Sequence, residues 1–408
     1  MNATGSGTTR PTVGTLRSPT EHCALRAVQF GAGNIGRGFI AQLFHESGFD
    51  VTFVDVVEPV VARINADGAY TIRIVGPGAA DVRIDRINAI HGTDRDGVAS
   101  AVASCAIACT AVGAGALKYV APNLAAGLAR RLAMGAPPLN VLVCENLHEA
   151  GKVLRDLVAA NLPADIRDAC LAGTGFVQAV VSRMVPIQTP DPHDPLTVRV
   201  EAYKRLPVDA NAVVGTLPDI VGVEPVTSFA AHEARKLFTH NCAHAALGYL
   251  GWLNGVEYGY EALETPKVRR ILDQALDETG SALVQRFGFD PGEHREHVAD
   301  LLARFANREL GDTCYRLARD PLRKLAPSDR LVGAARLCEE CGVRTDALAC
   351  IIASALRFSA TDDPSAVQLQ QMLREQGTEN VLKSVCGIAH DEDLGAAIIR
   401  EYRRLGTS

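Results

Sequence analysis

The sequence predicts an α/β protein with an N-terminal doubly wound parallel sheet and a mainly α-helical C-terminal domain. Short apolar runs alternate with helix-like segments from residue 26 onward, which is typical of βαβ units. A glycine-rich turn follows the first of these runs. Beyond about residue 210, apolar residues recur at helical spacing instead. We therefore expect a Rossmann-type domain at 25–210 and a helical substrate domain at 211–408.

The elements of the first domain follow one another in a regular order. The expected strands and the hairpin-like pair are 26–30, 51–55, 68–76, 81–90, 106–112, 140–144 and 196–201. Between the first two strands we expect a turn over 31–38 and a helix over 39–47. The uncharged stretch 98–117 consists mainly of small residues, so it predicts a helix running into a buried strand and not a transmembrane segment.

Helical periodicity fills most of the second half. The expected helices are 231–250, 266–287, 292–306, 346–358, 364–375 and 391–404. Thr265-Pro266 and Asp363-Pro364 each place a capping residue before a proline at the first helical position.

Composition and charge limit the classes of partner. The 408 residues include 41 basic and 47 acidic side chains, a formal net charge of −6, and no block of Lys or Arg. Nucleic acid and anionic membranes are therefore poor candidates, and a small molecule is the expected partner. Residues 1–24 are rich in Thr, Ser, Gly and Pro and lack an apolar run, so we expect a disordered tail and neither a secretory signal nor a transit peptide. A cytoplasmic location follows from these expectations.

The cysteines offer one pattern that could carry chemistry. Cys338 and Cys341 have the CxxC spacing of a zinc or redox site, although no second pair completes a set of four ligands. The other interpretation is that they are buried structural thiols, like most of the eleven cysteines, which lie in apolar runs. We expect reduced thiols and no metal.

The turn after the first strand has the dinucleotide-binding pattern G-x-G-x-x-G. Gly31 would permit the tight turn, Gly33 the approach of the pyrophosphate, and Gly36 close packing of helix on strand. Asp55 ends the second strand, where its carboxylate would accept from ribose hydroxyls and repel a 2′-phosphate; Arg63 is the nearby cation that could oppose this preference for NAD over NADP. The candidate NAD-binding residues are Ala27, Val28, Gln29, Phe30, Gly31, Ala32, Gly33, Asn34, Ile35, Gly36, Arg37, Gly38, Asp55, Val112 and Gly113.

A second group of polar residues lies on one expected helix. At 100° per residue, Glu233, Lys236 and His240 share a face with Asn241 and His244. Such a face is often only solvated, but this one mixes acid, base and amide. A desolvated lysine can take the hydroxyl proton during hydride transfer, and two amides can hold the oxygen. Lys236 would be the base, with Asn241 and Asn146 as donors and His244 orienting the alcohol.

Asn146 follows the strand 140–144, where ligands of such sheets bind. It could instead be a plain N-cap of a helix starting at Leu147.

Several motifs occur together in one order along the chain. They are FGAGNIGRGFI at 30–40, CEN at 144–146, GFVxxxVxRxVP at 175–186, DPLxVxVE at 194–201, RKLFTxNxxHA at 235–245 and PLRKLxxxDRL at 321–331. From about Ala27 to Leu405 the chain thus resembles the polyol-specific long-chain dehydrogenase/reductase family. The resemblance implies Lys236 as catalytic base, an oxyanion hole of Asn241 and Asn146, and His244 on the substrate oxygen. It also implies that Glu233 gates proton exit from the lysine, and that no metal is used.

The resemblance further implies a substrate and marks where this chain departs from the pattern. In its phosphate-using branch the reaction is the NAD-dependent interconversion of D-mannitol 1-phosphate and D-fructose 6-phosphate. The candidate phosphate ligands are Arg323, Lys324 and Arg330, with Arg183, Lys204 and Arg205 behind them. Family members tend to carry acids where this chain has Gln178 and Ser182, and we expect such departures at the far end of the pocket.

Two other functions stay open at this point. The first is dehydrogenation of an unphosphorylated polyol or a hexuronate by a member of the same family. The second is NAD binding without turnover, which the presence of Lys236, Asn241 and His244 disfavours. The sequence leaves the oligomeric state open between monomer and dimer.

Overall fold

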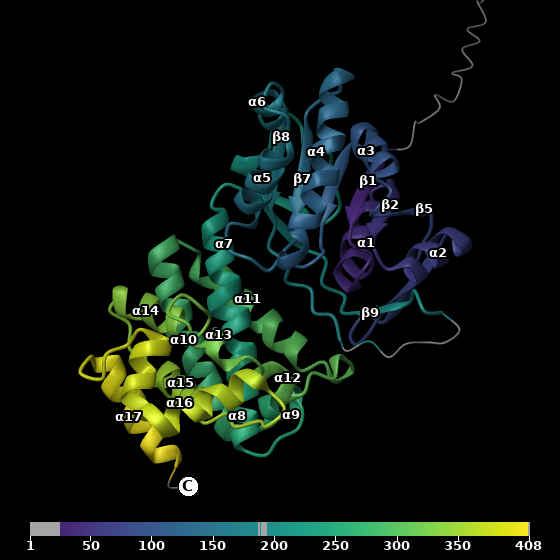
Figure 1. Cartoon of the computed structure of the whole chain (residues 1–408). Helices are drawn as coiled ribbons and strands as arrows, with labels where there is room; N and C mark the ends of the chain where they lie inside the picture. The colour runs from purple at the N-terminus through teal and green to yellow at the C-terminus, as the bar shows by residue number, and fades with distance from the viewer. Residues whose placement is uncertain (1–24, 187, 189–193, 407–408) are drawn as a thin grey trace, which may run out of the picture.

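The computed structural model describes residues 25–186, 188 and 194–406, so the tail expected at 1–24 lies outside the described residues. The chain forms a sheet domain and a helical domain, which lies below it in Figure 1. The main sheet is parallel throughout, in the order β5 (Ile87–His91), β2 (Asp50–Asp55), β1 (Arg26–Phe30), β6 (Ile107–Thr110), β7 (Leu139–Val143) and β8 (Thr174–Gln178). This confirms the doubly wound sheet.

Helices cover both faces of the main sheet because its strands are apolar on both sides. One face packs on α3 (Arg95–Ser104), α4 (Leu117–Ala133) and α5 (Ala150–Asn161), followed by the short α6 (Arg167–Ala172). The other packs on α1 (Ala41–Glu46), α2 (Glu58–Asp67) and a small sheet. The strand order changes direction on either side of β1, and this switch point places a ligand crevice at the carboxyl ends of β1 and β6.

The first helix begins earlier than expected. Residues are helical from Asn34, with a π-helical turn η1 (Gly36–Ile40) leading into α1, so the expected turn over 31–38 was too long. Gly36 explains the difference, because a Cβ there would overlap the carbonyl oxygen of Gly31. The missing side chain lets the helix start directly against the strand.

The small sheet contains the expected hairpin. Strands β3 (Tyr70–Ile74) and β4 (Ala80–Ile84) pair antiparallel, whereas β9 (Val198–Val200) joins β3 in parallel and stays outside the main sheet. A further parallel pair, β10 (Leu206–Asp209) and β11 (Val223–Val226), leads to the second domain. The first domain's core continues to Ile220, and the short η3 (Ala210–Ala212) spans the expected boundary at 210.

The second domain is helical, and all the helices expected between 231 and 404 are present. Additional short helices were not expected. Its elements are α7 (Phe229–Arg235), η4 (Lys236–Asn241), α8 (Cys242–Leu253), α9 (Gly259–Glu264), α10 (Pro266–Phe287), α11 (Pro291–Phe305), η5 (Arg308–Leu310), α12 (Cys314–Ala318), α13 (Pro321–Lys324), α14 (Val332–Glu340), α15 (Asp346–Leu356), α16 (Pro364–Val381), η6 (Leu382–Cys386) and α17 (Asp393–Leu405). Helices α8, α10 and α15 cross in its apolar core.

A buried ion pair joins the two domains. Arg304 on α11 donates from Nε to Oε2 of Glu201 at 2.8 Å and from Nη2 to the carbonyl oxygen of Ser182 at 2.6 Å. Its guanidinium also lies 4.0 Å from the ring centroid of Tyr203. Because both charged side chains are almost fully buried, the pair fixes α11 against the sheet domain.

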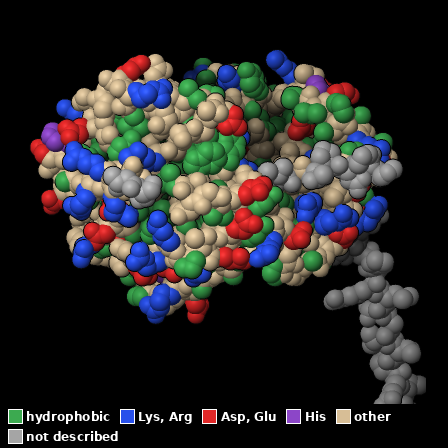
Figure 2. All heavy atoms as spheres, turned by 90° about the horizontal axis from the view of Figure 1, so that it is seen from below, with side chains coloured by type: hydrophobic (Ala, Val, Ile, Leu, Met, Phe, Trp, Pro, Cys, Tyr) green, Lys and Arg blue, Asp and Glu red, His purple; other side chains and the backbone are tan. Residues whose placement is uncertain are grey.

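The remaining sequence predictions concern metal binding by cysteines, membrane-spanning helices and the distribution of surface charge. Cys338 is buried and Cys341 partly buried, both as free thiols, and the described residues contain no group of three or more side chains able to hold a metal. No helix in the described part of the chain is long and apolar enough to cross a membrane. Figure 2 shows basic and acidic side chains interspersed over one face of the molecule.

Candidate active site

The glycine-rich turn leaves an open side toward the crevice. Gly31 has φ +93°, a conformation that favours glycine, and a Cβ there would overlap the carbonyl oxygen of Ala111. At Gly33, by contrast, no heavy atom lies within 4 Å of where a Cβ would stand. Backbone N–H groups at the start of the first helix are thus accessible to an anion, and the turn fits a dinucleotide pyrophosphate.

Asp55 lies at the end of β2 beside this turn. Its Oδ2 accepts from the N–H of Ala32 at 2.6 Å and its Oδ1 from the N–H of Val57 at 2.9 Å. The carboxylate is therefore fixed next to the glycine turn, at the position where it would meet a ribose.

The other candidate cofactor residues fall into two groups. Ala27, Val28, Gln29 and Phe30 are buried within β1, and Gln29 donates to the carbonyl oxygens of Phe30 and Gly31. Arg37 is also buried, and donates to the carbonyl oxygens of Ala32 and Leu196. These buried side chains support the turn from its protein-facing side. Gly33 and Asn34 are exposed and Ile35 is partly exposed on the open side, whereas Ala32 is buried and Gly38 packs against Val198.

A buried carboxylate holds the loop after β6, which contains the candidate cofactor residues Val112 and Gly113. The sequence analysis did not identify this carboxylate. Glu145 accepts from the N–H of Val112 at 2.9 Å with Oε1 and from the N–H of Gly113 at 2.8 Å with Oε2. The loop after β6 is thereby tied to the residue that follows β7. Because the partners of Glu145 are backbone groups, only its place beside Asn146 could have indicated this role.

Lys236 and Asn146 meet although they are ninety positions apart in the sequence. The Lys236 amine donates to Oδ1 of Asn146 at 3.2 Å, so helix and sheet domain share one site as predicted. Asn146 is not the N-cap of the next helix, since α5 begins at Ala150 and its N-cap position is Glu149. The alternative interpretation of Asn146 as a plain helix N-cap is therefore wrong.

The lysine lies in a π-helical turn, η4, between α7 and α8. A π turn closes hydrogen bonds from i to i+5, so Asn241 returns above Lys236. The uniform 100° spacing assumed from the sequence would have set the two 140° apart. Pi turns of this kind occur mostly as single turns at functional sites.

The Lys236 amine is poised to lose its proton near neutral pH. Burial, and after it the positive charge of Arg330, lowers the pKa of Lys236 from its usual 10.5 to about 8. The carboxylates of Glu233 and Asp329 act in the opposite direction. A lysine with this pKa can be a general base.

Asn241 and His244 line the same stretch of helix. Asn241 is buried, and His244 is partly buried and stacks on Phe305 with ring centroids 4.2 Å apart. Burial, together with the charge of Arg304, lowers the pKa of His244 to about 3, so its imidazole is neutral at physiological pH. Neutral imidazole can both donate and accept a hydrogen bond.

Glu233, one turn before the lysine, contacts the sheet domain. Its Oε1 accepts from Nε2 of Gln178 at 2.9 Å, and its Oε2 lies 3.7 Å from Nδ1 of His148. The expectation that the departure at Gln178 lies at the far end of the pocket is wrong, because β8 delivers this side chain to the acid beside the lysine. Strand β8 itself was not predicted, which explains the error.

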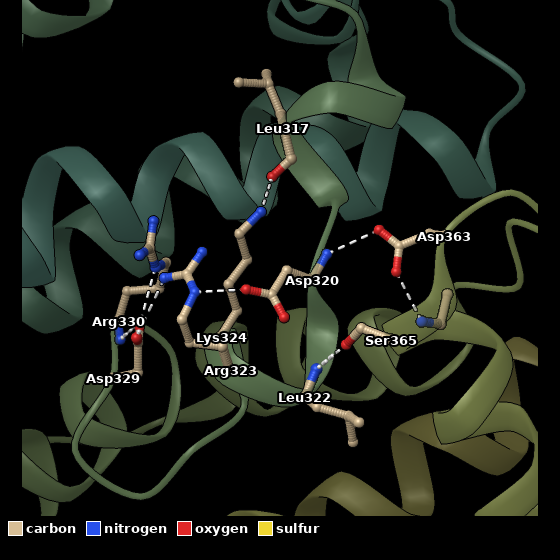
Figure 3. Close-up of polar contacts among 10 residues, drawn as sticks. Leu317, Asp320, Leu322, Arg323, Lys324, Asp329, Arg330, Asp363 and Ser365 are labelled. Carbon is tan, nitrogen blue, oxygen red and sulfur yellow. Dashed lines mark hydrogen bonds and ion pairs between the residues drawn. The ribbon is translucent and has the colours of Figure 1, made fainter. Parts of the chain in front are cut away.

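The candidate phosphate residues gather on and after α13, as Figure 3 shows. Arg330 pairs with Asp329 at 2.7 Å, and Arg323 pairs with Asp320 at 2.5 Å, with their guanidinium groups side by side. Lys324 is buried and donates to the carbonyl oxygen of Leu317. Burial and the neighbouring arginines lower the pKa of Lys324 to about 7. Arg323 and Arg330 offset Asp320 and Asp329, so the net positive charge of this cluster rests on Lys324, which is partly protonated at pH 7.

Helix α16 braces the cation cluster from the other side. Asp363 accepts from the N–H of Asp320 at 2.9 Å, and Ser365 accepts from the N–H of Leu322 at 3.0 Å (Figure 3). Asp320 has φ 62°, a left-handed conformation that this bond helps to hold.

The more distant candidate cations are already paired. Lys204 binds Glu46 at 2.8 Å and Arg205 binds Glu224 at 2.7 Å. Arg183 is buried and donates to the carbonyl oxygen of Glu201, so none of these faces the site.

A dinucleotide-type sheet whose switch point faces a lysine from a helical domain defines a class, the two-domain dehydrogenases. Comparison with known families agrees with this class. The model of the mannitol dehydrogenase Rossmann domain matches residues 25–222, and that of the mannitol dehydrogenase C-terminal domain matches residues 228–405. The chain belongs to the mannitol dehydrogenase family, and it is an oxidoreductase.

Curated relatives align over almost the whole chain. It is 41% identical over 378 residues to a mannitol-1-phosphate 5-dehydrogenase of Bacillus licheniformis, covering 92% of this chain and 99% of the relative. It is 39% identical to the Bacillus subtilis mannitol-1-phosphate 5-dehydrogenase, over 93% and 100% of the two chains.

Solved structures show the same fold at low identity. The Pseudomonas fluorescens mannitol 2-dehydrogenase, in ternary complex with NAD and D-mannitol, has a TM-score of 0.73 at 19% identity, covering 94% of this chain and 92% of that one. A D-sorbitol dehydrogenase in substrate-free form has a TM-score of 0.77 at 17% identity, covering 94% of each chain. The two-domain architecture predicted from the sequence is confirmed.

Proposed function

We propose that this protein is an NAD-dependent oxidoreductase that interconverts D-mannitol 1-phosphate and D-fructose 6-phosphate. The observation that carries the proposal is the contact between the Lys236 amine and Asn146 at the carboxyl end of the sheet, with the lysine pKa lowered to about 8. The names of the aligned relatives support the substrate.

The cofactor assignment depends on the glycine turn and on Asp55. The open side at Gly33 offers backbone N–H groups to the pyrophosphate, and the fixed Asp55 carboxylate would accept from the ribose hydroxyls. The same negative charge disfavours a 2′-phosphate, so the proposed cofactor is NAD and not NADP. When bound, NAD supplies the hydride acceptor for the polyol carbon.

Residues of both domains handle the proton and the oxygen. The neutral Lys236 amine takes the hydroxyl proton of the polyol as the carbon is oxidised. Asn146 and Asn241 donate from their amides to the oxygen, while neutral His244 orients it. Glu233 receives the proton from Lys236 so that the amine is free for the next turnover.

The cation cluster is the proposed site of the substrate phosphate. Arg330 acts electrostatically on Lys236, so it reaches toward the reacting end of the pocket, and its side chain is only 12% exposed. Guanidinium groups bind phosphate oxygens through paired N–H donors. A phosphate dianion beside Lys324 would also favour the charged form of that amine, whose pKa is otherwise about 7.

The test compares NADH oxidation with fructose 6-phosphate and with fructose, without added metal. We expect turnover with the phosphate ester only. Arg330→Met should raise KM for fructose 6-phosphate roughly 10- to 150-fold, the range for loss of a charged hydrogen bond. Lys267→Met, at an exposed position in the first turn of α10, is the matched control and should leave KM unchanged. Equal turnover of fructose would instead favour an unphosphorylated polyol or a hexuronate.

A further inference from the structure

The two oxygens of the Glu233 carboxylate have different surroundings. Oε1 accepts a hydrogen bond from Gln178 at 2.9 Å, whereas Oε2 lies 3.7 Å from Nδ1 of His148. The Glu233 side chain is 32% exposed, and that of His148 is 83% exposed. The carboxylate therefore lies between the buried lysine site and an imidazole that is open to bulk water.

Gln178 is held so that its amide nitrogen faces Glu233. Its Oε1 accepts from the N–H of Gly151 at 3.4 Å, and its Nε2 also reaches the carbonyl oxygen of Leu147 at 3.5 Å. An amide nitrogen donates and does not accept. The Oε1 of Glu233 is consequently occupied by a donor, and a proton arriving on the carboxylate binds to Oε2, the oxygen that faces His148.

From this arrangement we propose that His148 is the outer proton acceptor of the site and that Gln178 is a positioning residue for the relay. The inference rests on the proposed function, in which each polyol oxidised leaves one proton on Lys236. That proton passes from Nζ of Lys236 to Oε2 of Glu233, and from there to Nδ1 of His148. The imidazole then releases a proton from Nε2 to water, so one proton leaves and no electrons move.

His148 suits this step chemically. An imidazole can accept a proton on one ring nitrogen and release one from the other. Its place in the loop between β7 and α5, two residues after Asn146, brings it to Glu233 without contact to the reacting oxygen. A change at His148 should therefore slow proton release while leaving hydride transfer intact.

Stopped-flow measurement of a single turnover separates these two events. Wild-type protein, saturated with NAD, is mixed with D-mannitol 1-phosphate in weak buffer containing a pH-indicator dye, and NADH absorbance is followed in parallel. In His148→Ala, we expect first-turnover NADH formation at the wild-type rate and proton release slowed roughly tenfold or more. Imidazole added to the solution should restore the release rate. His390→Ala, at an exposed histidine between η6 and α17, is the control and should behave as wild type.

Gln178→Met provides a second variant, because a methionine side chain has no N–H to donate to the Oε1 of Glu233. We expect slow proton release that imidazole does not restore, since His148 is intact and the defect lies in the position of Glu233. Wild-type release rates in both His148→Ala and Gln178→Met would overturn the inference, as would a slow His148→Ala variant that imidazole fails to rescue. If wild-type protein forms no NADH with D-mannitol 1-phosphate, the proposed function fails first and the relay with it.

Discussion

The lowered pKa of Lys236 makes the rate of polyol oxidation sensitive to pH in a defined range. With a pKa of about 8, about 24% of the amine is neutral at pH 7.5, compared with about 0.1% for a lysine at the usual 10.5. The site thus offers roughly 240 times more base at this pH than an ordinary lysine would. Burial causes most of this difference, since desolvation disfavours the charged amine.

The sign of the pH dependence follows from the role of the amine. In the proposed function oxidation needs neutral Lys236, so kcat/KM for D-mannitol 1-phosphate should fall about tenfold per pH unit below pH 8 and level off above about pH 9. Reduction of fructose 6-phosphate needs the protonated amine, so its rate should fall as pH rises through 8. The substrate phosphate titrates near pH 6, so it gives the pH–rate profile a second sloping part, or limb, at lower pH.

A charge substitution tests whether the limb near pH 8 reflects the titration of Lys236. Because Arg330 lowers the lysine pKa, Arg330→Met should move the limb to higher pH, while Lys267→Met should leave it in place. The assay is the initial rate of NADH formation at low substrate across pH 6 to 10, which reports the free enzyme. A profile that is flat between pH 7 and 9, or a limb that Arg330→Met leaves unmoved, would refute the reasoning.

Three further substitutions test features that support the site. Gly36→Ala would press a Cβ into Gly31, and should lower the free energy of unfolding by about 1–3 kcal/mol and weaken NADH binding, measured by thermal denaturation and fluorescence titration. Glu201→Gln leaves buried Arg304 with only the exposed Asp300, 3.6 Å away, as a charge partner, and should cost up to about 3–5 kcal/mol in the same denaturation assay. Glu145→Gln turns an amide NH₂ toward a loop N–H, and should raise KM for NAD with a loss of about 1–3 kcal/mol in stability.

The parts of the site that the sequence predicted depend on local signals. The glycine turn and Asp55 are recognisable because strand, turn and strand are contiguous in the chain. Asn146 could be placed at the ligand-binding edge of the sheet because it follows a parallel strand, and the structure brings Lys236 of the helical domain to 3.2 Å from it. The roles proposed for these residues are what the experiments above measure.

The parts that the sequence missed depend on pairings between distant segments. Strand β8 reads Thr-Gly-Phe-Val-Gln, too short and mixed to be recognised alone, and its place in the sheet comes from pairing with β7. Without β8, the contact from Gln178 to Glu233 was invisible. Glu145 was missed for a related reason, because its partners are backbone N–H groups that every residue carries.

The π turn at Lys236 can also be regarded as a one-residue insertion that a continuous helix has absorbed. If the same residues instead formed a uniform α-helix of unchanged length, everything before the π turn would rotate by about 100° relative to α8. The buried face of α8 would keep its packing, while Lys236 and Glu233 would turn away from the sheet domain. The backbone hydrogen-bond pattern of this segment, as distinct from the identity of its side chains, therefore sets the direction in which Lys236 points, and a change that converts the π turn to α-helix at unchanged length should misplace the lysine.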